Sequence, residues 1–309
     1  MAEVYVWGDG SQVASFDAHS IAIAHYLSLY YPEIKIIPNS NVFGSYNGRL
    51  PMLITANGQQ IHGYKRIVDY TRKNFTGNGT LKEPKDVEMN LIYNGFMEST
   101  LETFEIITAY NLFLNKDNYI SYTRPLFKIL LPFPLQYGAP LKFRQDASDL
   151  CENYGITADD SFKEENSHDI EMIKAKENEL SSTPILNNVQ KLQVEKSLNE
   201  LAIKKSALTN MRCIELLDET VSQYKQLKIE SFSAPGILFL SYLEVNTNSA
   251  LECTFVKNYL EQSSPSLLQQ LDSFSKVGDK FQIQQKPISL VSALCTATVS
   301  YTHLTLPTN

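Results

Sequence analysis

The residues able to do metal or redox chemistry are few and far apart. Four cysteines occur, none in a CxxC pair: Cys151, Cys213, Cys253 and Cys295. Metal sites and disulfide frameworks usually bring cysteines closer together, so we expect reduced thiols that behave as small buried hydrophobes. The histidines show no HExxH or HxH spacing, and no GxSxG, P-loop or GxGxxG motif occurs. The sequence therefore predicts no metal and no cofactor.

Serine hydroxyls are the other groups with possible chemistry. Ser11 and Ser15 follow the string VWGDG, close to the start of the chain. A hydroxyl becomes a useful nucleophile or thiol activator only when a neighbouring group activates it. Neither serine lies in a recognisable activating context, and turn-rich surroundings also suit loop or capping serines. We favour the structural interpretation for both.

The elements that must position these groups alternate in type over residues 1–75. Strands are expected at 3–8, 33–38, 49–54 and 59–63, with helices at 19–31 and 64–74. Asp17 can cap the first helix, and Asn57-Gly58 predicts a hairpin turn between the last two strands. The order β-α-β, then β-β-α, describes a thioredoxin-like domain.

The rest of the chain is predicted to be helical. A polar linker at 76–84 leads into an all-helical domain, 85–276, with helical spacing at 86–115, 140–154, 189–228 and in later runs beginning at ILFLSYL. The 189–228 run is long enough for one helix or two. A charged insertion, 156–184, resembles a solvated and partly disordered segment. Residues 277–309 form an irregular tail whose end resembles translated adaptor sequence rather than native chain.

The fold class is thus α/β plus all-α, and it resembles the glutathione transferases. In that fold the proline before the third strand is normally cis, and Pro51 lies at this position; a cis X–Pro bond costs only about 0.5–1 kcal/mol. Active transferases also start the closing helix with an acidic or amide residue followed by serine. Here those positions read Gly63-Tyr64. The helix N-terminus for a carboxylate is kept, but we expect a phenol in its way.

A thiol activator directly after the first strand is also missing from the string Trp7-Gly8-Asp9-Gly10. Of the three features of an active transferase, only the proline before the third strand is present; the acid-or-amide–serine pair and the thiol activator are both missing. We therefore expect no glutathione chemistry and no enzyme. The alternative is a glutathione-dependent transferase, or a related thiol enzyme, with an atypical site that uses Ser11 or Ser15.

Longer strings resemble one family more specifically. These are VWGDGSQVASFDAHSIAIAHYL, GRLPMLITANGQQIHGYKRIVDYTRKN and the segment 110–152, YNLFLNKDNYISYTRPLFKILLPFPLQYGAPLKFRQDASDLCE. They resemble the fungal metaxin-like subunit of the mitochondrial outer-membrane sorting and assembly machinery. The resemblance implies a non-enzymatic peripheral subunit on the cytosolic face of the outer membrane. Its implied partners are a β-barrel core subunit, a second transferase-like subunit, β-barrel precursors and the membrane surface.

The segment 119–143 concentrates aromatic and aliphatic residues around four prolines, which we expect to hold it irregular and partly extended. We predict an interaction surface at Tyr119, Tyr122, Phe127, Phe133, Leu135 and Tyr137. Such anchors suit a protein interface or a lipid headgroup layer. The alternative is the core of the helical domain, where large apolar residues usually lie. Charging Phe133 and Leu135 should free a docked protein from its complex, but unfold it if the segment is core.

Charge and hydropathy exclude other classes. The chain carries 27 basic and 34 acidic residues, a net charge of -7, which gives no concentrated basic surface for nucleic acid. No stretch reaches the ~18 apolar residues of a membrane span, so we expect no transmembrane helix in the residues shown. Some relatives carry a C-terminal hydrophobic anchor; none is seen in this chain, and truncation of the sequence is one explanation. The N-terminus lacks the pattern of a secretory signal.

Overall fold

The computed structural model describes residues 2–9, 12–40, 45–46, 48–77, 86–157 and 184–278. Between 184 and 202 it describes the backbone course, with the side chains of Lys196 and Glu200 alone. Most of the predicted linker, nearly all of the charged insertion and almost the whole tail fall outside these ranges. The expectations for them, and for the exact domain boundaries, remain predictions.

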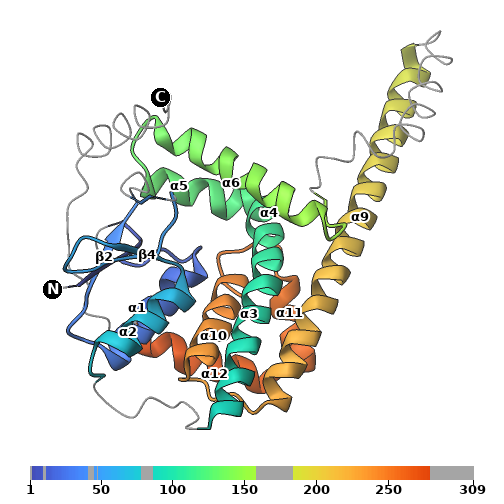
Figure 1. Ribbon diagram of the computed structural model, residues 1–309. Helices are drawn as coiled ribbons and strands as arrows, with labels where there is room; N and C mark the ends of the chain where they lie inside the picture. Colours follow the sequence, from blue (N-terminus) through green and yellow to red (C-terminus); the bar gives the residue numbers. More distant parts are fainter. Residues whose placement is uncertain are drawn as a thin grey trace, which may run out of the picture.

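The N-terminal half is built on a four-stranded mixed sheet (Figure 1). The strands are β1 (Glu3–Trp7), β2 (Lys35–Asn39), β3 (Met52–Ile54) and β4 (Gln60–His62), in the order β2-β1-β3-β4. β1 runs parallel to β2, with Val4 beside Ile36, and antiparallel to β3, which pairs antiparallel with β4. Helix α1 (Ala18–Tyr30) connects β1 to β2, and α2 (Tyr64–Asn74) closes the unit. This confirms the thioredoxin-like order.

Local chemistry explains where these elements begin and turn. The Asp17 carboxylate accepts a hydrogen bond from the Ser20 N–H at 2.9 Å, as expected of an N-cap. Between β3 and β4, the Thr55 N–H donates to the Gln59 carbonyl at 2.9 Å. Gly58 adopts φ 78°, which favours glycine and accounts for the Asn-Gly signal.

The second half is helical wherever the structure describes an element of it. Its elements are α3 (Val87–Ala109), η2 (Tyr110–Leu114, a π-helical turn), α4 (Lys116–Asn118), η3 (Tyr119–Thr123, a second π-helical turn), α5 (Arg124–Leu130), α6 (Leu135–Glu152), α9 (Pro184–Gln226), α10 (Ala234–Asn246), α11 (Phe255–Ser263) and α12 (Pro265–Gly278). The long apolar run is therefore one helix, α9. Together with the sheet unit, this arrangement is the predicted glutathione-transferase-like fold.

Helix α10 forms the centre of the molecule. All its residues except Glu244 are buried, because α10 packs against α1 on one side and α3 on the other (Figure 1). Ser233 caps the helix by accepting the Gly236 N–H at 3.3 Å, so hydroxyl capping is present without a reciprocal carboxylate. A Cβ at Gly236 would lie 2.0 Å from the Glu230 carbonyl oxygen, which explains the glycine in that turn.

The expectation of an irregular, extended segment at 119–143 is wrong. Only the residues between α5 and α6, which include a cis Phe133–Pro134 bond, are non-helical there. Pro125 stands in the first turn of α5, where its missing N–H costs little, and Pro140 is accommodated inside α6. Pro125 and Pro134 thus stand at helix starts, and Pro140 lies within a helix.

Candidate functional site

The predicted pocket edge is formed where β3, β4 and α2 meet. The Leu50–Pro51 bond is cis, and the Pro51 carbonyl accepts the Gly63 N–H at 3.3 Å. Gly63 precedes α2 with φ 82°, a conformation that favours glycine, and has no side chain to cap the helix. The loop before Pro51 is fixed by Ser45, whose hydroxyl donates to the Arg49 carbonyl at 2.8 Å.

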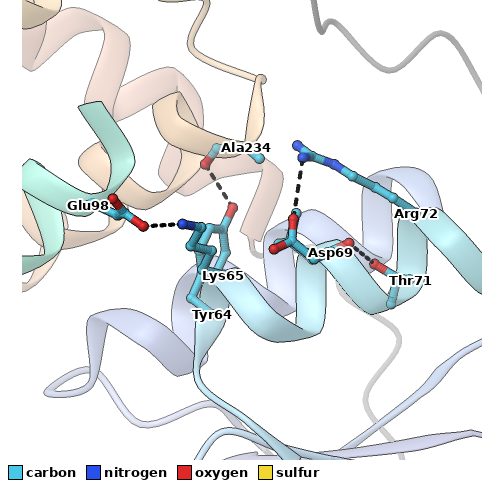
Figure 2. Close-up of polar contacts among 8 residues, drawn as sticks. Tyr64, Lys65, Asp69, Thr71, Arg72, Glu98 and Ala234 are labelled. Atoms are coloured by element: carbon cyan, nitrogen blue, oxygen red, sulfur yellow. Dashed lines mark hydrogen bonds and ion pairs between the residues drawn. The ribbon is translucent and has the colours of Figure 1, made fainter. Parts of the chain in front are cut away.

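Tyr64 does not project from the start of α2 into solvent. Its side chain is buried, and its hydroxyl donates to the Ala234 carbonyl at the start of α10, at 2.8 Å (Figure 2). Burial raises the pKa of this phenol well above its ordinary value, so the group remains a hydrogen-bond donor. The expected phenol in the path of a carboxylate is therefore corrected: the phenol connects the two halves.

The position directly after β1 has no room for an activating side chain. A Cβ at Gly8 would lie 2.1 Å from the Gln12 carbonyl oxygen and 2.5 Å from the Pro38 Cβ. Tyrosine, serine or cysteine could not replace this glycine without moving the loop. Trp7, the last residue of β1, packs edge-on against Phe16, Phe127 and Phe143. Aromatic side chains therefore occupy the space around the end of β1.

Ser15 is also committed to a structural contact. Its hydroxyl lies 2.7 Å from the Tyr122 hydroxyl, which also accepts a hydrogen bond from the Asn248 side chain at 3.2 Å. Burial raises the pKa of Tyr122, which opposes formation of a phenolate that could act as a base. Ser11 lies outside the described residues. Of the two candidate serines, the one described thus joins the N-terminal half to the helical half.

These contacts belong to a set that we call the tyrosine seam: four tyrosine hydroxyls that hydrogen-bond between the two halves. Their pairs are Tyr30 with the Phe232 carbonyl, Tyr64 with the Ala234 carbonyl, Tyr122 with Ser15, and Tyr242 with His19 Nε2. A buried tyrosine needs a partner for its hydroxyl, and here each partner lies across the boundary. Sequence reasoning missed the seam. The available signal was the 17 tyrosines against one tryptophan.

Two further polar pairs lie at the exposed rim of the boundary. Lys65 of α2 pairs with Glu98 of α3 (Figure 2), and His19 Nε2 lies 3.7 Å from a Glu105 carboxylate oxygen. Both pairs are partly exposed, and exposed pairs contribute little because water and salt screen them. The tyrosine hydroxyls, rather than these partly exposed pairs, define how the halves meet.

A buried asparagine network supports the string 110–152. The Asn118 side chain accepts the Cys253 N–H at 2.7 Å and donates to the Asn111 side chain at 2.8 Å. Asn111 in turn donates to Asn246 at 3.0 Å. The network fixes η2 and α4 against the chain around α10 and α11. Sequence reasoning gave no role to these asparagines, although their recurrence in YNLFLNKDN was visible.

The structure divides the predicted interaction surface. Tyr119, Tyr122 and Phe127 are buried, and Leu135 is half-buried against the core, so these four do not form a free surface. Phe133 and Tyr137 are 70% and 50% exposed, with ring centroids 6.1 Å apart. As a correction, an exposed surface here is limited to the turn between α5 and α6 and the start of α6.

The described thiols and His25 lie in structural positions. Cys151 and Cys213 are buried, and burial raises the pKa of Cys151 to about 12 and that of Cys213 further still. Such thiols hold their protons and react slowly. Cys253 is half-buried, and Cys295 lies outside the described residues. His25 is buried and stacks on Phe274 of α12 with ring centroids 3.8 Å apart.

A surface cavity of 590 Å³ lies elsewhere, between the end of α9, the 228–232 loop and the start of α12. None of the predicted site residues lines it. Among the described residues, no helix combines the length and apolar character needed to cross a bilayer.

Comparisons with known proteins connect this arrangement to one family. Residues 20–144 match a family model, Tom37, described as an outer mitochondrial membrane transport complex protein, and residues 157–289 match the Tom37 C-terminal domain. Metaxin-3 of Xenopus laevis is 26% identical over 149 residues, 48% of this chain and 47% of the relative. Metaxin-1 of Mus musculus is 26% identical over 139 residues, 45% of this chain and 43% of the relative.

Metaxin-1 of Homo sapiens is 25% identical over 139 residues, 45% of this chain and 29% of the relative. The chain thus spans less than half the length of these curated relatives. The two family models together cover most of the chain, and it belongs to the metaxin-like Tom37 family of outer mitochondrial membrane transport complex proteins.

Proposed function

We propose that the chain is a non-enzymatic, peripheral subunit of the mitochondrial outer-membrane sorting and assembly machinery. On the cytosolic face it supports insertion and release of β-barrel precursors, beside a β-barrel core subunit and a second transferase-like subunit. Membership in a family of outer-membrane transport complex proteins supports this role. The β-barrel cargo and the named partners come from the resemblance of the three long strings.

One observation carries the non-enzymatic part of the proposal. Groups at the pocket positions of a transferase serve the boundary between the halves: Tyr64 bonds to Ala234 and Ser15 bonds to Tyr122. Gly8 also has no room for an activating side chain. The alternative, a glutathione-dependent transferase with an atypical site, would have to break a seam contact to use Ser15.

The proposal is tested by purifying the affinity-tagged full chain from native mitochondrial outer membrane under mild conditions. A β-barrel subunit and a second transferase-like protein should co-purify, and the chain should pellet with mitochondria. Mitochondria depleted of the chain should accumulate unassembled β-barrel precursors, while a matrix precursor with a cleavable presequence is imported normally. A free chain in the cytosolic fraction, or normal β-barrel assembly after depletion, would contradict the proposal.

A further inference from the structure

An exposed apolar patch lies on the surface formed by α5 and α6. We define the α5–α6 patch as Ile129, Phe133, Tyr137 and Leu141, which are 72%, 70%, 50% and 64% exposed. Phe133 and Tyr137 touch edge to face, and Tyr137 and Leu141 stand four residues apart on one side of α6. α5 and α6 pack side by side along one edge of the molecule, away from α12 (Figure 1). Phe133, Tyr137 and Leu141 therefore face solvent along the start of α6, and Ile129 is exposed on the neighbouring helix α5.

The helices that carry the patch are basic close to it. Residues 118–145 hold four basic side chains and no acidic one, with Asp117 and Asp146 at the two ends of this stretch, although the chain as a whole has a net charge of -7. Lys128 adjoins Ile129 on the exposed side of α5, Lys142 adjoins Leu141 on the exposed side of α6, and Arg124 is exposed at the start of α5. Arg144 lies over the Tyr119 ring at 4.8 Å. The patch is thus apolar with a basic border.

This chemistry favours a bilayer over a protein partner. Interfacial helices place aromatic and aliphatic side chains at the boundary between headgroups and acyl chains, with lysine and arginine beside anionic headgroups. Aromatic residues are common in both kinds of contact, but lysine is depleted in protein–protein interfaces and is favoured beside anionic headgroups, so Lys128 and Lys142 favour the membrane. We propose that the α5–α6 patch docks the chain onto an anionic phospholipid surface. The proposal rests on the proposed function only because that function brings the chain to a membrane.

Flotation of the purified full chain with vesicles tests the proposal. Two vesicle compositions are compared: phosphatidylcholine alone, and phosphatidylcholine with about 20% of an anionic phospholipid. The chain should float with the anionic vesicles, float poorly with the neutral ones, and lose binding as salt is raised. A folded chain that does not bind anionic vesicles, or that binds both compositions equally, would overturn the proposal. The first of these results is expected if another part of this chain covers the patch.

A double variant of the patch, compared with a double variant elsewhere, locates the contact. Phe133→Asp with Tyr137→Asp should lower vesicle partitioning about tenfold or more, because it removes apolar contact and adds like charge. The control is Val87→Asp with Leu91→Asp, which charges two residues of α3 that are 81% and 74% exposed. The control should bind as the unmodified chain does. Equal losses in both pairs, or none in the first, would overturn the location.

A second double variant, again with a matched control, tests the basic border of the patch. Lys128→Gln with Lys142→Gln should lower binding to anionic vesicles about tenfold, because each lysine near the surface contributes attraction. Lys204→Gln with Lys276→Gln, which changes net charge equally at exposed positions of α9 and α12, should have little effect. If both pairs weaken binding equally, overall charge rather than the patch is recognised, and the proposal is overturned.

Co-purification separates this inference from the proposed function. If the purified chain does not bind vesicles but still co-purifies with the outer-membrane complex, the lipid contact is overturned and the proposed function stands. If it binds anionic vesicles through the patch but co-purifies with no β-barrel subunit, the lipid contact is supported and the proposed function is contradicted.

Discussion

Phe127 and Phe133 stand six residues apart in one aromatic string, and the fold places them in opposite surroundings. Phe127 is fully buried against Trp7, Phe16 and Phe143, at the boundary between the two halves. Phe133 is 70% exposed in the turn before α6. The comparison shows that the string has two roles: one part fixes the halves together, and the other is available to a surface outside the molecule.

The largest expected difference comes from making the same substitution at both positions. Phe127→Ala should lower the free energy of unfolding by about 3–5 kcal/mol, because it leaves a cavity beside Trp7. Phe133→Ala should change it by less than about 0.5 kcal/mol. Urea unfolding followed by the fluorescence of Trp7, the single tryptophan, measures both. Equal costs would show that the two regions are not distinct.

The asparagine network should rank next. Asn118→Ala should cost about 3 kcal/mol of unfolding free energy, because the buried Asn111 side-chain oxygen and the partly buried Cys253 N–H lose their partner. Asn74→Ala, at an exposed amide that donates to the Tyr70 carbonyl, serves as control and should cost about 0.5 kcal/mol or less. A small effect at Asn118 would mean that water or a rearranged neighbour replaces the network.

A pH dependence should come from the boundary but not from the patch. Burial lowers the pKa of His25 to about 3, whereas an unfolded histidine titrates near 6.5. As pH falls, the unfolded chain therefore takes up the proton first. The contribution of His25 to stability is complete above about pH 6.5 and is lost as pH falls towards 3, with about 2 kcal/mol lost at pH 5.

Urea unfolding at about pH 7.5 and pH 5 measures this loss in the unmodified chain and in His25→Gln. The variant should lose less stability between the two values, because glutamine does not titrate. Identical losses in both proteins would show that His25 binds protons equally in the folded and unfolded states.

The smallest expected loss of unfolding free energy comes from removing single tyrosine hydroxyls, one in the seam and one on the patch. Tyr64→Phe should cost about 1 kcal/mol, because the Ala234 carbonyl loses a buried hydrogen bond. Tyr137→Phe, on the exposed patch, should be nearly neutral for stability. If Tyr64→Phe is also neutral, the seam positions the halves without stabilising them, and burial of the aromatic rings alone holds the boundary.

Much of the N-terminal fold could be predicted because its signals are local. Asp17 as a cap, Asn57-Gly58 as a turn and residues 64–74 as the closing helix depend on neighbouring residues, and all three are confirmed. Helical spacing likewise predicted most of the second half. Proline misled the interpretation of 119–143, because Pro125 and Pro140 fit within helices once neighbouring turns are satisfied.

The candidate site could be predicted only in part, because its contacts join residues far apart in sequence. Gly63-Tyr64 stands at the start of α2 as predicted, but the direction of the phenol depends on Ala234, 170 residues later. The same holds for Ser15 and Tyr122. Aromatic composition marked the string 119–143 as unusual, yet only packing decides which rings are buried.

Titration of the full chain with reduced glutathione, followed by calorimetry, tests the central claim most directly. At concentrations up to about 10 mM, which would reveal millimolar dissociation constants, the account predicts no saturable binding. Ser15→Ala should leave that result unchanged, because the Ser15 hydroxyl serves the Tyr122 contact. Saturable binding that Ser15→Ala abolishes would contradict the account and favour the alternative, a glutathione-dependent transferase or related thiol enzyme.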